Sequence, residues 1–133
     1  MNTSVTGVWH NQHHSILHLT SDGDRLTGTF RPGIGLLHGQ SFPIQGWVLG
    51  DRVAFSVAFG PTGAITSWTG HLRGLDSTGF LDTLWNMSVR EESAAGADEG
   101  WRSIWTGADT FRRGEPGLMV IDRRRPSVPA HGS

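Results

Sequence analysis

The feature that most constrains this chain is its rhythm of short alternating segments. Apolar and polar residues alternate within each segment, and turn residues separate the segments at roughly 8–12-residue spacing. No window of about 12 or more residues keeps the apolar period of a helix. The predicted strands lie near residues 7–12, 15–20, 25–31, 41–48, 52–59, 65–73, 79–89 and 101–111. Short links between consecutive strands favour an all-β, eight-stranded antiparallel up-and-down β-barrel, a size that can hold one small ligand.

The strand rhythm ends near Gly114. We therefore predict a barrel domain over residues 1–113 and a flexible C-terminal tail over residues 114–133. The run Arg123-Arg124-Arg125 in this tail is interpreted as solvated. The apolar residues 118–121 could instead add to the edge or pocket of a neighbouring molecule.

The composition excludes several functions. The chain has no Cys, Lys or Tyr, so it has no disulfide, Cys-ligated zinc site or Schiff-base lysine. Its net charge of −1 gives no basic field for nucleic acid or an anionic membrane, and no run approaches the ~18 apolar residues of a membrane span. A Gly-x-Ser-x-Gly elbow is also missing. We expect no enzyme and no cofactor.

The first residues, Met1-Asn2-Thr3-Ser4, lack the charged and apolar regions of a signal peptide. A secreted or periplasmic protein is therefore expected only if such a peptide has been removed.

Four histidines crowd the start of the chain: His10, His13, His14 and His18. On a strand, His13 and His14 would point to opposite faces, and no carboxylate precedes Asp22. We therefore predict no metal site and interpret these side chains as surface histidines.

Aromatic residues are concentrated in the predicted strands: Trp9, Phe30, Phe59, Trp68, Trp85, Trp101 and Trp105. Core packing would explain any one of them, but the set favours an aromatic-walled pocket for a flat or cyclic ligand. Polar residues share these strands, namely Asn11, Ser15, Thr66 and Asp109. If they converge at one barrel end, their donors and single carboxylate suit a urea-like group.

The connection over residues 33–39 is apolar, whereas hairpin loops are normally polar. Ile34, Leu36 and Leu37 must pack against something. A lid over an apolar pocket is one interpretation, and a contact between subunits is the other.

These residues carry a resemblance to the avidin/streptavidin family over about residues 5–112. The matching segments are Gly7-Val8-Trp9-His10-Asn11-Gln12 with Ser15, Leu26-Thr27-Gly28-Thr29-Phe30, Trp68-Thr69-Gly70, Leu84-Trp85, Trp101 and Gly107-Ala108-Asp109-Thr110-Phe111. The resemblance implies non-covalent, high-affinity binding of biotin at one end of the barrel.

The resemblance also implies roles for individual residues. Asn11 and Ser15 would donate to the ureido oxygen of biotin, and Asp109 would accept from a ureido N–H. Thr66 would face the thioether sulfur. Trp101 would close the site of a neighbouring subunit. The walls around the bicyclic ring would be formed by Phe59, Trp68 and Trp85. We also predict Phe30 and Ile34 among the ligand-binding residues.

The chain departs from the family at several positions. Phe30 stands where Tyr is usual, and Pro32 lies near a position that often holds Ser. Phe59 replaces a Trp, Ala64 replaces a polar residue near the ligand carboxylate, and His13 replaces a Leu. Each lost hydrogen bond costs about 0.5–1.5 kcal/mol, which predicts binding on the order of 10–1,000-fold weaker than in the tightest relatives.

The resemblance implies a homo-oligomer. Segments 41–47 and 54–57 are similar to the bacterial dimeric branch, but the loop disulfide of that branch is impossible without Cys. Trp101 favours a tetramer instead. The sequence leaves dimer and tetramer open.

Two other functions remain open at this stage. One is a carrier of another small cyclic or apolar ligand on a lipocalin-like barrel. The other is a hydrolase or a lectin-like sugar-binding protein, since Trp side chains also stack on sugars.

Overall fold

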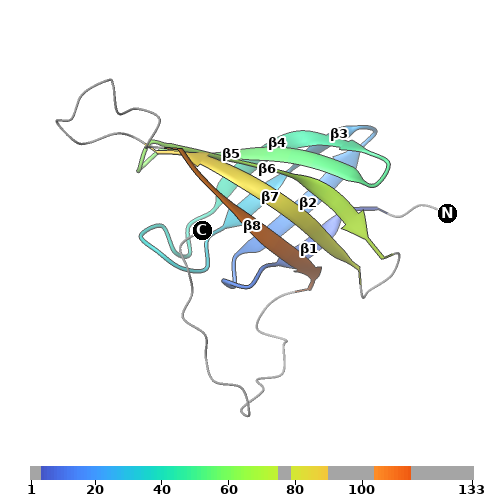
Figure 1. The fold of residues 1–133 in the computed structure, drawn as a ribbon, viewed down its shortest axis with the longest axis horizontal. Coiled ribbons are helices and arrows are strands. Elements are labelled where there is room, and N and C mark those ends of the chain that lie inside the picture. Colours follow the sequence, from blue (N-terminus) through green and yellow to red (C-terminus); the bar gives the residue numbers. More distant parts are fainter. Residues whose placement is uncertain (1–3, 75–78, 90–103, 115–133) are drawn as a thin grey trace, which may run out of the picture.

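The computed structural model describes residues 4–74, 79–89 and 104–114. Each strand pairs antiparallel with its sequence neighbours, and the last pairs back with the first, which closes the barrel (Figure 1). The strands are β1 (Gly7–His10), β2 (Ile16–Asp22), β3 (Arg25–Arg31), β4 (Phe42–Leu49), β5 (Arg52–Phe59), β6 (Ala64–Arg73), β7 (Phe80–Ser88) and β8 (Ile104–Arg113). The predicted fold class is confirmed, and the strand ends agree to within about three residues.

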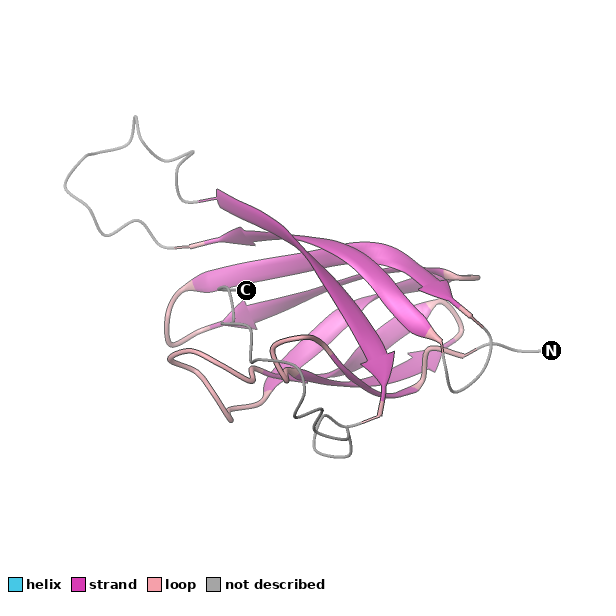
Figure 2. Cartoon of the chain, turned by 60° about the horizontal axis from the view of Figure 1, so that its bottom comes forward, coloured by secondary structure: helices cyan, strands magenta, loops and turns pink. Residues whose placement is uncertain are grey.

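Alternation along each strand produces the core. On β5, Val53, Phe55, Val57 and Phe59 are buried inside the barrel, whereas the residues between them are exposed or half-buried. Successive strand residues point to opposite faces of the sheet. Side chains at every second position therefore fill the barrel interior, and those between them face solvent. The strands make up nearly all of the wall, as the second view shows (Figure 2). The described residues contain no helix long and apolar enough to cross a membrane.

Two tight hairpin loops fix the register at one end of the barrel. Gly23, between β2 and β3, has a φ of 63°, and Gly50, between β4 and β5, has a φ of 60°. Two-residue hairpin loops require positive φ at their first central position, where glycine carries no steric cost. These glycines therefore set which residues of the paired strands face inward.

The seam between β1 and β8 is short. The two strands pair only through Trp9 with Arg113 and His10 with Arg112. The predicted extension of the first strand to residue 12 is wrong, because the chain turns sharply after His10. His14 adopts a φ of 65°, and its amide donates to the Asn11 carbonyl at 3.1 Å.

The interpretation of the early histidines as surface residues is wrong for two of them. His10 and His13 are buried, whereas His14 and His18 are exposed. His10 Nδ1 lies 2.8 Å from the carbonyl oxygen of Gly114, and because a carbonyl can only accept, the ring nitrogen donates. His10 therefore ties the end of β1 to the end of β8.

Trp9 fills the barrel at the end where β1 pairs with the last residues of β8, and its side chain is completely buried. We call this end the plugged end. Its indole Nε1 donates to the Val5 carbonyl at 2.9 Å, and the Arg113 guanidinium lies 4.2 Å from its ring centroid. The indole N–H therefore has a hydrogen-bond acceptor, and the aromatic ring contacts a cation.

Candidate ligand-binding site

The opposite end of the barrel contains a cavity of about 200 Å³. Its walls come from β3, β5, β6, β7 and β8 and from the loops after β3 and β5. The cavity brings together seven of the ten residues predicted for a binding site: Phe30, Ile34, Phe59, Thr66, Trp68, Trp85 and Asp109. Its volume is below the about 300–1,000 Å³ typical of ligand pockets, which favours a compact ligand.

One wall is a packed aromatic cluster. The Phe30 ring lies 5.1 Å from the Trp68 ring and 5.8 Å from the Phe59 ring, measured between centroids. Behind this wall, Phe55 stacks on Trp68 with centroids 5.1 Å apart and an interplanar angle of 17°. Rings held on several sides lose little freedom when a ligand arrives, so the wall is preorganised.

Asp109 is the charged residue of the described lining and is 3% exposed. Its Oδ2 accepts a hydrogen bond from Trp68 Nε1, and its Oδ1 accepts one from Gln12 Nε2, each at 3.0 Å. Each carboxylate oxygen can accept more than one hydrogen bond. The carboxylate is therefore fixed in orientation and still able to accept from a ligand N–H.

Two polar atoms of the lining make no hydrogen bond with the described residues. They are the Thr66 hydroxyl oxygen and the Trp85 indole nitrogen, both fully buried. Leaving a buried polar group unsatisfied costs about 1–3 kcal/mol. A ligand that offered partners to these atoms would remove that cost on binding.

Gly107 explains how Trp85 reaches its place. A Cβ atom at Gly107 would lie 2.3 Å from Cζ2 of Trp85, far inside van der Waals contact. The indole therefore lies against the bare backbone of β8. Glycine within a strand is otherwise weakening, so its position here reflects this close approach.

The loop over residues 33–39 covers part of the cavity. Ile34, Leu36 and Leu37 all line it, although Leu36 remains 87% exposed. The Gly39 amide donates to the Pro32 carbonyl at 3.1 Å and closes the base of the loop. This placement agrees with the interpretation of the loop as a lid; whether it closes over a ligand stays a prediction.

Asn11 and Ser15 lie in the turn between β1 and β2, not on strands as predicted. Both are buried, yet neither lines the cavity. The Asn11 side-chain oxygen accepts from the amides of His13 at 2.9 Å and Ser15 at 3.0 Å. Ser15 Oγ accepts from the Gly33 amide at 3.0 Å, which places this hydroxyl beside the loop that covers the cavity.

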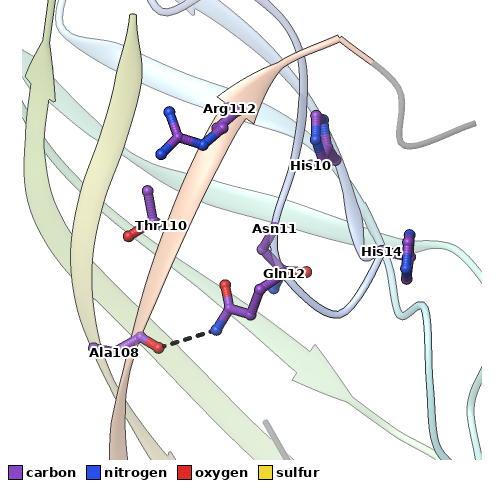
Figure 3. A pocket seen from close by; sticks show the side chains of 7 residues that line it. All are labelled: His10, Asn11, Gln12, His14, Ala108, Thr110 and Arg112. Carbon is purple, nitrogen blue, oxygen red and sulfur yellow. Dashed lines mark hydrogen bonds between the residues drawn. The ribbon is translucent and has the colours of Figure 1, made fainter. Parts of the chain in front are cut away.

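A second hollow of about 410 Å³ lies at the seam of the barrel (Figure 3). It is bounded by the turn after β1 and by the outward-facing residues Ala108, Thr110 and Arg112 of β8. Gln12 reaches across this outer groove, and its Nε2 lies 3.4 Å from the Ala108 carbonyl and 3.0 Å from Asp109 Oδ1. Gln12 thus separates the outer groove from the Asp109 carboxylate.

The other tryptophans of the predicted aromatic set have different positions. Trp9 fills the plugged end and does not line the cavity, and Trp105 is 59% exposed, so neither belongs to an aromatic-walled pocket. Trp105 lies near the start of β8, beyond the reach of the short β1. Trp101 lies outside the described residues.

Sequence reasoning missed several residues of the site, Thr62 of the cavity lining among them. Met87 lines the cavity, and Thr83 donates its hydroxyl to the Asp109 carbonyl at 2.8 Å. Both share the inward face of β7 with Trp85, so the period of two could have identified them. The bond from Gln12 to Asp109 joins residues 97 positions apart and leaves no signal in the local sequence.

Comparison with known proteins identifies the family. A model of the avidin family matches residues 1–114. The structure is similar to xenavidin, at 24% identity and a TM-score of 0.71 over 85% of this chain and 99% of that chain. It is also similar to rhizavidin in a biotin complex (25% identity, TM-score 0.69, 84% and 96% covered). A biotin complex of a shwanavidin variant is similar as well (26% identity, TM-score 0.68, 85% and 100% covered). This chain is a member of the avidin family.

Proposed function

We propose that this protein binds biotin non-covalently in the cavity that contains Asp109. The observation that carries the proposal is a buried carboxylate, oriented by Trp68 and Gln12, in the lining of a compact aromatic cavity. Membership of the avidin family and the biotin complexes of rhizavidin and shwanavidin support the choice of ligand.

The chemistry of the cavity suits the bicyclic head of biotin. A ureido N–H donates to the Asp109 carboxylate, and a charged acceptor makes this hydrogen bond stronger than a neutral one. The bicyclic ring system packs between Trp68 and Trp85, and Thr66 offers its unpartnered hydroxyl within the same cavity. Apolar burial of the rings supplies the non-directional part of the affinity.

The ureido oxygen requires donors, and the turn after β1, which is joined to the loop over the cavity by the Ser15–Gly33 hydrogen bond, carries two candidates. Because the Asn11 side-chain oxygen already accepts two amides, the group that Asn11 can offer a ligand is its NH₂. Because Ser15 Oγ accepts from Gly33, its own proton can point elsewhere and donate. We assign these two donors to the ureido oxygen.

The proposed function is binding without a chemical step. The Asp109 carboxylate is held by an indole and an amide rather than by a histidine, and the described lining contains no histidine. A nucleophile activated by a neighbouring base, as in covalent catalysis, is therefore missing from the described lining.

The expected affinity is below that of the tightest relatives. Phe30 presents only hydrocarbon to the cavity, so this wall donates no hydrogen bond. At about 0.5–1.5 kcal/mol for each missing bond, two or three such losses weaken binding on the order of 10–1,000-fold.

We also propose that the protein forms a homo-oligomer through the outer face of β6, β7 and β8. Ile65 and Ile104 flank Ser88 in the strand register, and Leu84 lies on the same outer face of β7. The three apolar side chains are each more than half exposed. Light scattering that gives a monomer mass at micromolar concentration would contradict this proposal.

Calorimetry with biotin tests the proposed function. The wild-type protein is expected to bind one biotin per chain, whereas Asp109→Ala loses affinity on the order of tenfold or more because a charged hydrogen bond is worth about 1.5–3 kcal/mol. Arg112→Gln is the control, since Arg112 lines the outer groove and not the cavity.

The alternative is a carrier of another compact cyclic or apolar ligand. Wild-type protein that ignores biotin, or an Asp109→Ala protein that is folded and binds it unchanged, would favour that alternative. An effect of Arg112→Gln as large as that of Asp109→Ala would move the site to the outer groove.

A further inference from the structure

The outer groove at the barrel seam exists because β1 is short. β1 ends at His10, and over residues 104–111 no described strand pairs with β8 on that side. Gln12 crosses the gap with its side chain, and its Nε2 lies 3.4 Å from the Ala108 carbonyl oxygen. The groove volume of about 410 Å³ falls within the about 300–1,000 Å³ typical of ligand pockets. No described residue lines both this groove and the cavity, so the groove is a separate hollow.

The open edge of β8 offers a backbone donor to the groove. The Ala108 carbonyl faces Gln12, and a residue of an antiparallel strand turns its N–H and its C=O to the same side. Thr110 lies two residues further along β8 and therefore also turns its N–H toward the groove. Its side chain lines the groove as well, so this one residue can offer an amide and a hydroxyl.

Arg112 gives this wall of the groove a positive charge. It follows Thr110 by two residues on the same face of β8, which corresponds to about 7 Å. Its guanidinium lies 5.2 Å from the centroid of the Phe80 ring and makes no ion pair with the described residues. The carboxylate opposite Thr110 in the register belongs to Asp82, which pairs with Arg73 at 3.3 Å. Because the described lining of the groove contains no Asp or Glu, an anion there would meet an uncompensated cation.

His14 lines the groove from the turn after β1 and holds a backbone conformation that favours glycine. Its φ is 65°, a region in which most side chains are strained. Its imidazole is nevertheless exposed to the groove, and Figure 3 shows His14 and Arg112 apart, on the two elements that bound this hollow. Strain of this kind is concentrated at functional sites, so we expect the imidazole to contact a ligand.

We propose that the outer groove is a second binding site, for a small phosphomonoester. The phosphate group lies against β8, where Arg112 donates in the bidentate geometry that suits phosphate and Thr110 donates through its amide and hydroxyl. The organic part extends across Gln12, and an acceptor oxygen on it meets His14. Gln12 lies between this ligand and the Asp109 carboxylate, to which its own amide donates at 3.0 Å. The site is independent of the proposed binding of biotin.

NMR titration of the full-length, isotope-labelled protein tests the proposal. Glycerol 3-phosphate, inorganic phosphate and glycerol are added separately at constant pH and ionic strength. Glycerol 3-phosphate is expected to shift the amide signals of Ala108 and Thr110, and the shifts saturate with a dissociation constant on the order of 1 mM. Inorganic phosphate is expected to bind several-fold more weakly because it does not reach His14, and glycerol is expected not to bind.

Two results of this titration would overturn the proposal. Shifts that grow with glycerol 3-phosphate without saturating would mean that the groove is no binding site. Inorganic phosphate that binds as tightly as the ester would contradict the assignment of the groove to a phosphomonoester. Either result leaves the proposed biotin site standing, because the two hollows share no described residue.

Arg112→Gln removes the charge at the proposed phosphate contact. It is expected to weaken the binding of glycerol 3-phosphate by about tenfold, since a hydrogen bond to a charged group is lost. Arg52→Gln is the matched control, because Arg52 is an exposed arginine on β5, across the barrel from the seam between β1 and β8. Equal losses in the two variants would reflect net charge alone and would contradict the site.

His14→Gly separates binding from folding. Glycine adopts a φ of 65° without steric cost, so this variant is expected to fold like the wild-type protein and to bind glycerol 3-phosphate several-fold more weakly. His18→Ala removes an exposed imidazole of β2 that does not line the groove, and it is expected to leave the affinity unchanged. A His14→Gly protein that is folded and binds the ester as tightly as the wild type would contradict the contact assigned to His14.

Discussion

The two ends of this barrel use the same type of residue in opposite ways. At the plugged end, Trp9 is completely buried, and its Nε1 donates to a backbone carbonyl. At the cavity end, Trp85 is 6% exposed, and its Nε1 makes no hydrogen bond with the described residues. Burial alone does not distinguish the two indoles, whereas their hydrogen bonding does.

This difference indicates which end of the barrel is built for stability and which for binding. At the plugged end, the described groups around Trp9 match each other, as expected for a packed core. At the cavity end, Thr66 and Trp85 keep polar atoms unsatisfied, a cost that the plugged end avoids. Unsatisfied buried groups that face a cavity are a typical sign of a site whose partner is a ligand.

The largest expected effect is on stability at the plugged end. Trp9→Ala should lower the free energy of unfolding by about 3–5 kcal/mol, the range for removing a large buried aromatic side chain. Urea denaturation followed by circular dichroism measures this loss, and biotin affinity of the folded fraction should change little.

Trp105→Ala is the matched control, because this indole is 59% exposed. Its expected loss is about 0.5 kcal/mol or less, as for ordinary surface substitutions. Similar losses in the two variants would contradict the assignment of Trp9 as the structural plug.

The next effect concerns the contact between β8 and Trp85. Gly107→Ala places a methyl group 2.3 Å from the indole, so the ring must shift into the cavity or the strand must move. Overpacking of this kind costs about 1–3 kcal/mol, and the displaced ring should also weaken biotin binding.

Thermal unfolding of Gly107→Ala measures its loss of stability, and calorimetry with biotin measures its loss of affinity. Gly60→Ala is the control, since a Cβ at Gly60 meets no atom within 4 Å. If Gly107→Ala retained both wild-type stability and wild-type affinity, Trp85 would not lie against β8 as described.

The smallest expected effects are changes in the free energy of unfolding at two buried threonines, and the two changes have opposite signs. Thr66→Val removes an unsatisfied hydroxyl and should raise the free energy of unfolding by about 1 kcal/mol without ligand. Thr83→Val removes a hydroxyl that donates to the Asp109 carbonyl and should lower it by about 1 kcal/mol. Denaturation of both variants without biotin tests the comparison, and a loss of stability in both would mean that Thr66 is already satisfied.

Much of the cavity could be predicted from the sequence because strands have a period of two. Thr66 and Trp68 share one face of β6, and recognising that alternation is enough to place both inside. The period also fixes Asp109 on the inner face of β8 once the strand is recognised.

The turn after β1 could not be predicted in the same way. Its shape depends on the Asn11 side chain, which accepts from two backbone amides and so competes with continuation of the strand. Such local competition is decided by the surrounding fold. The exposure of Trp105 likewise depends on how far the short β1 extends along β8, which the pattern of β8 itself does not contain.

A crystal structure of the protein with biotin tests the central claim most directly. We expect the ureido ring beside the Asp109 carboxylate, its faces against Trp68 and Trp85, and the acyl chain directed past Ala64. Biotin located in the outer groove between His10 and Arg112, with the inner cavity lacking ligand density, would contradict the account.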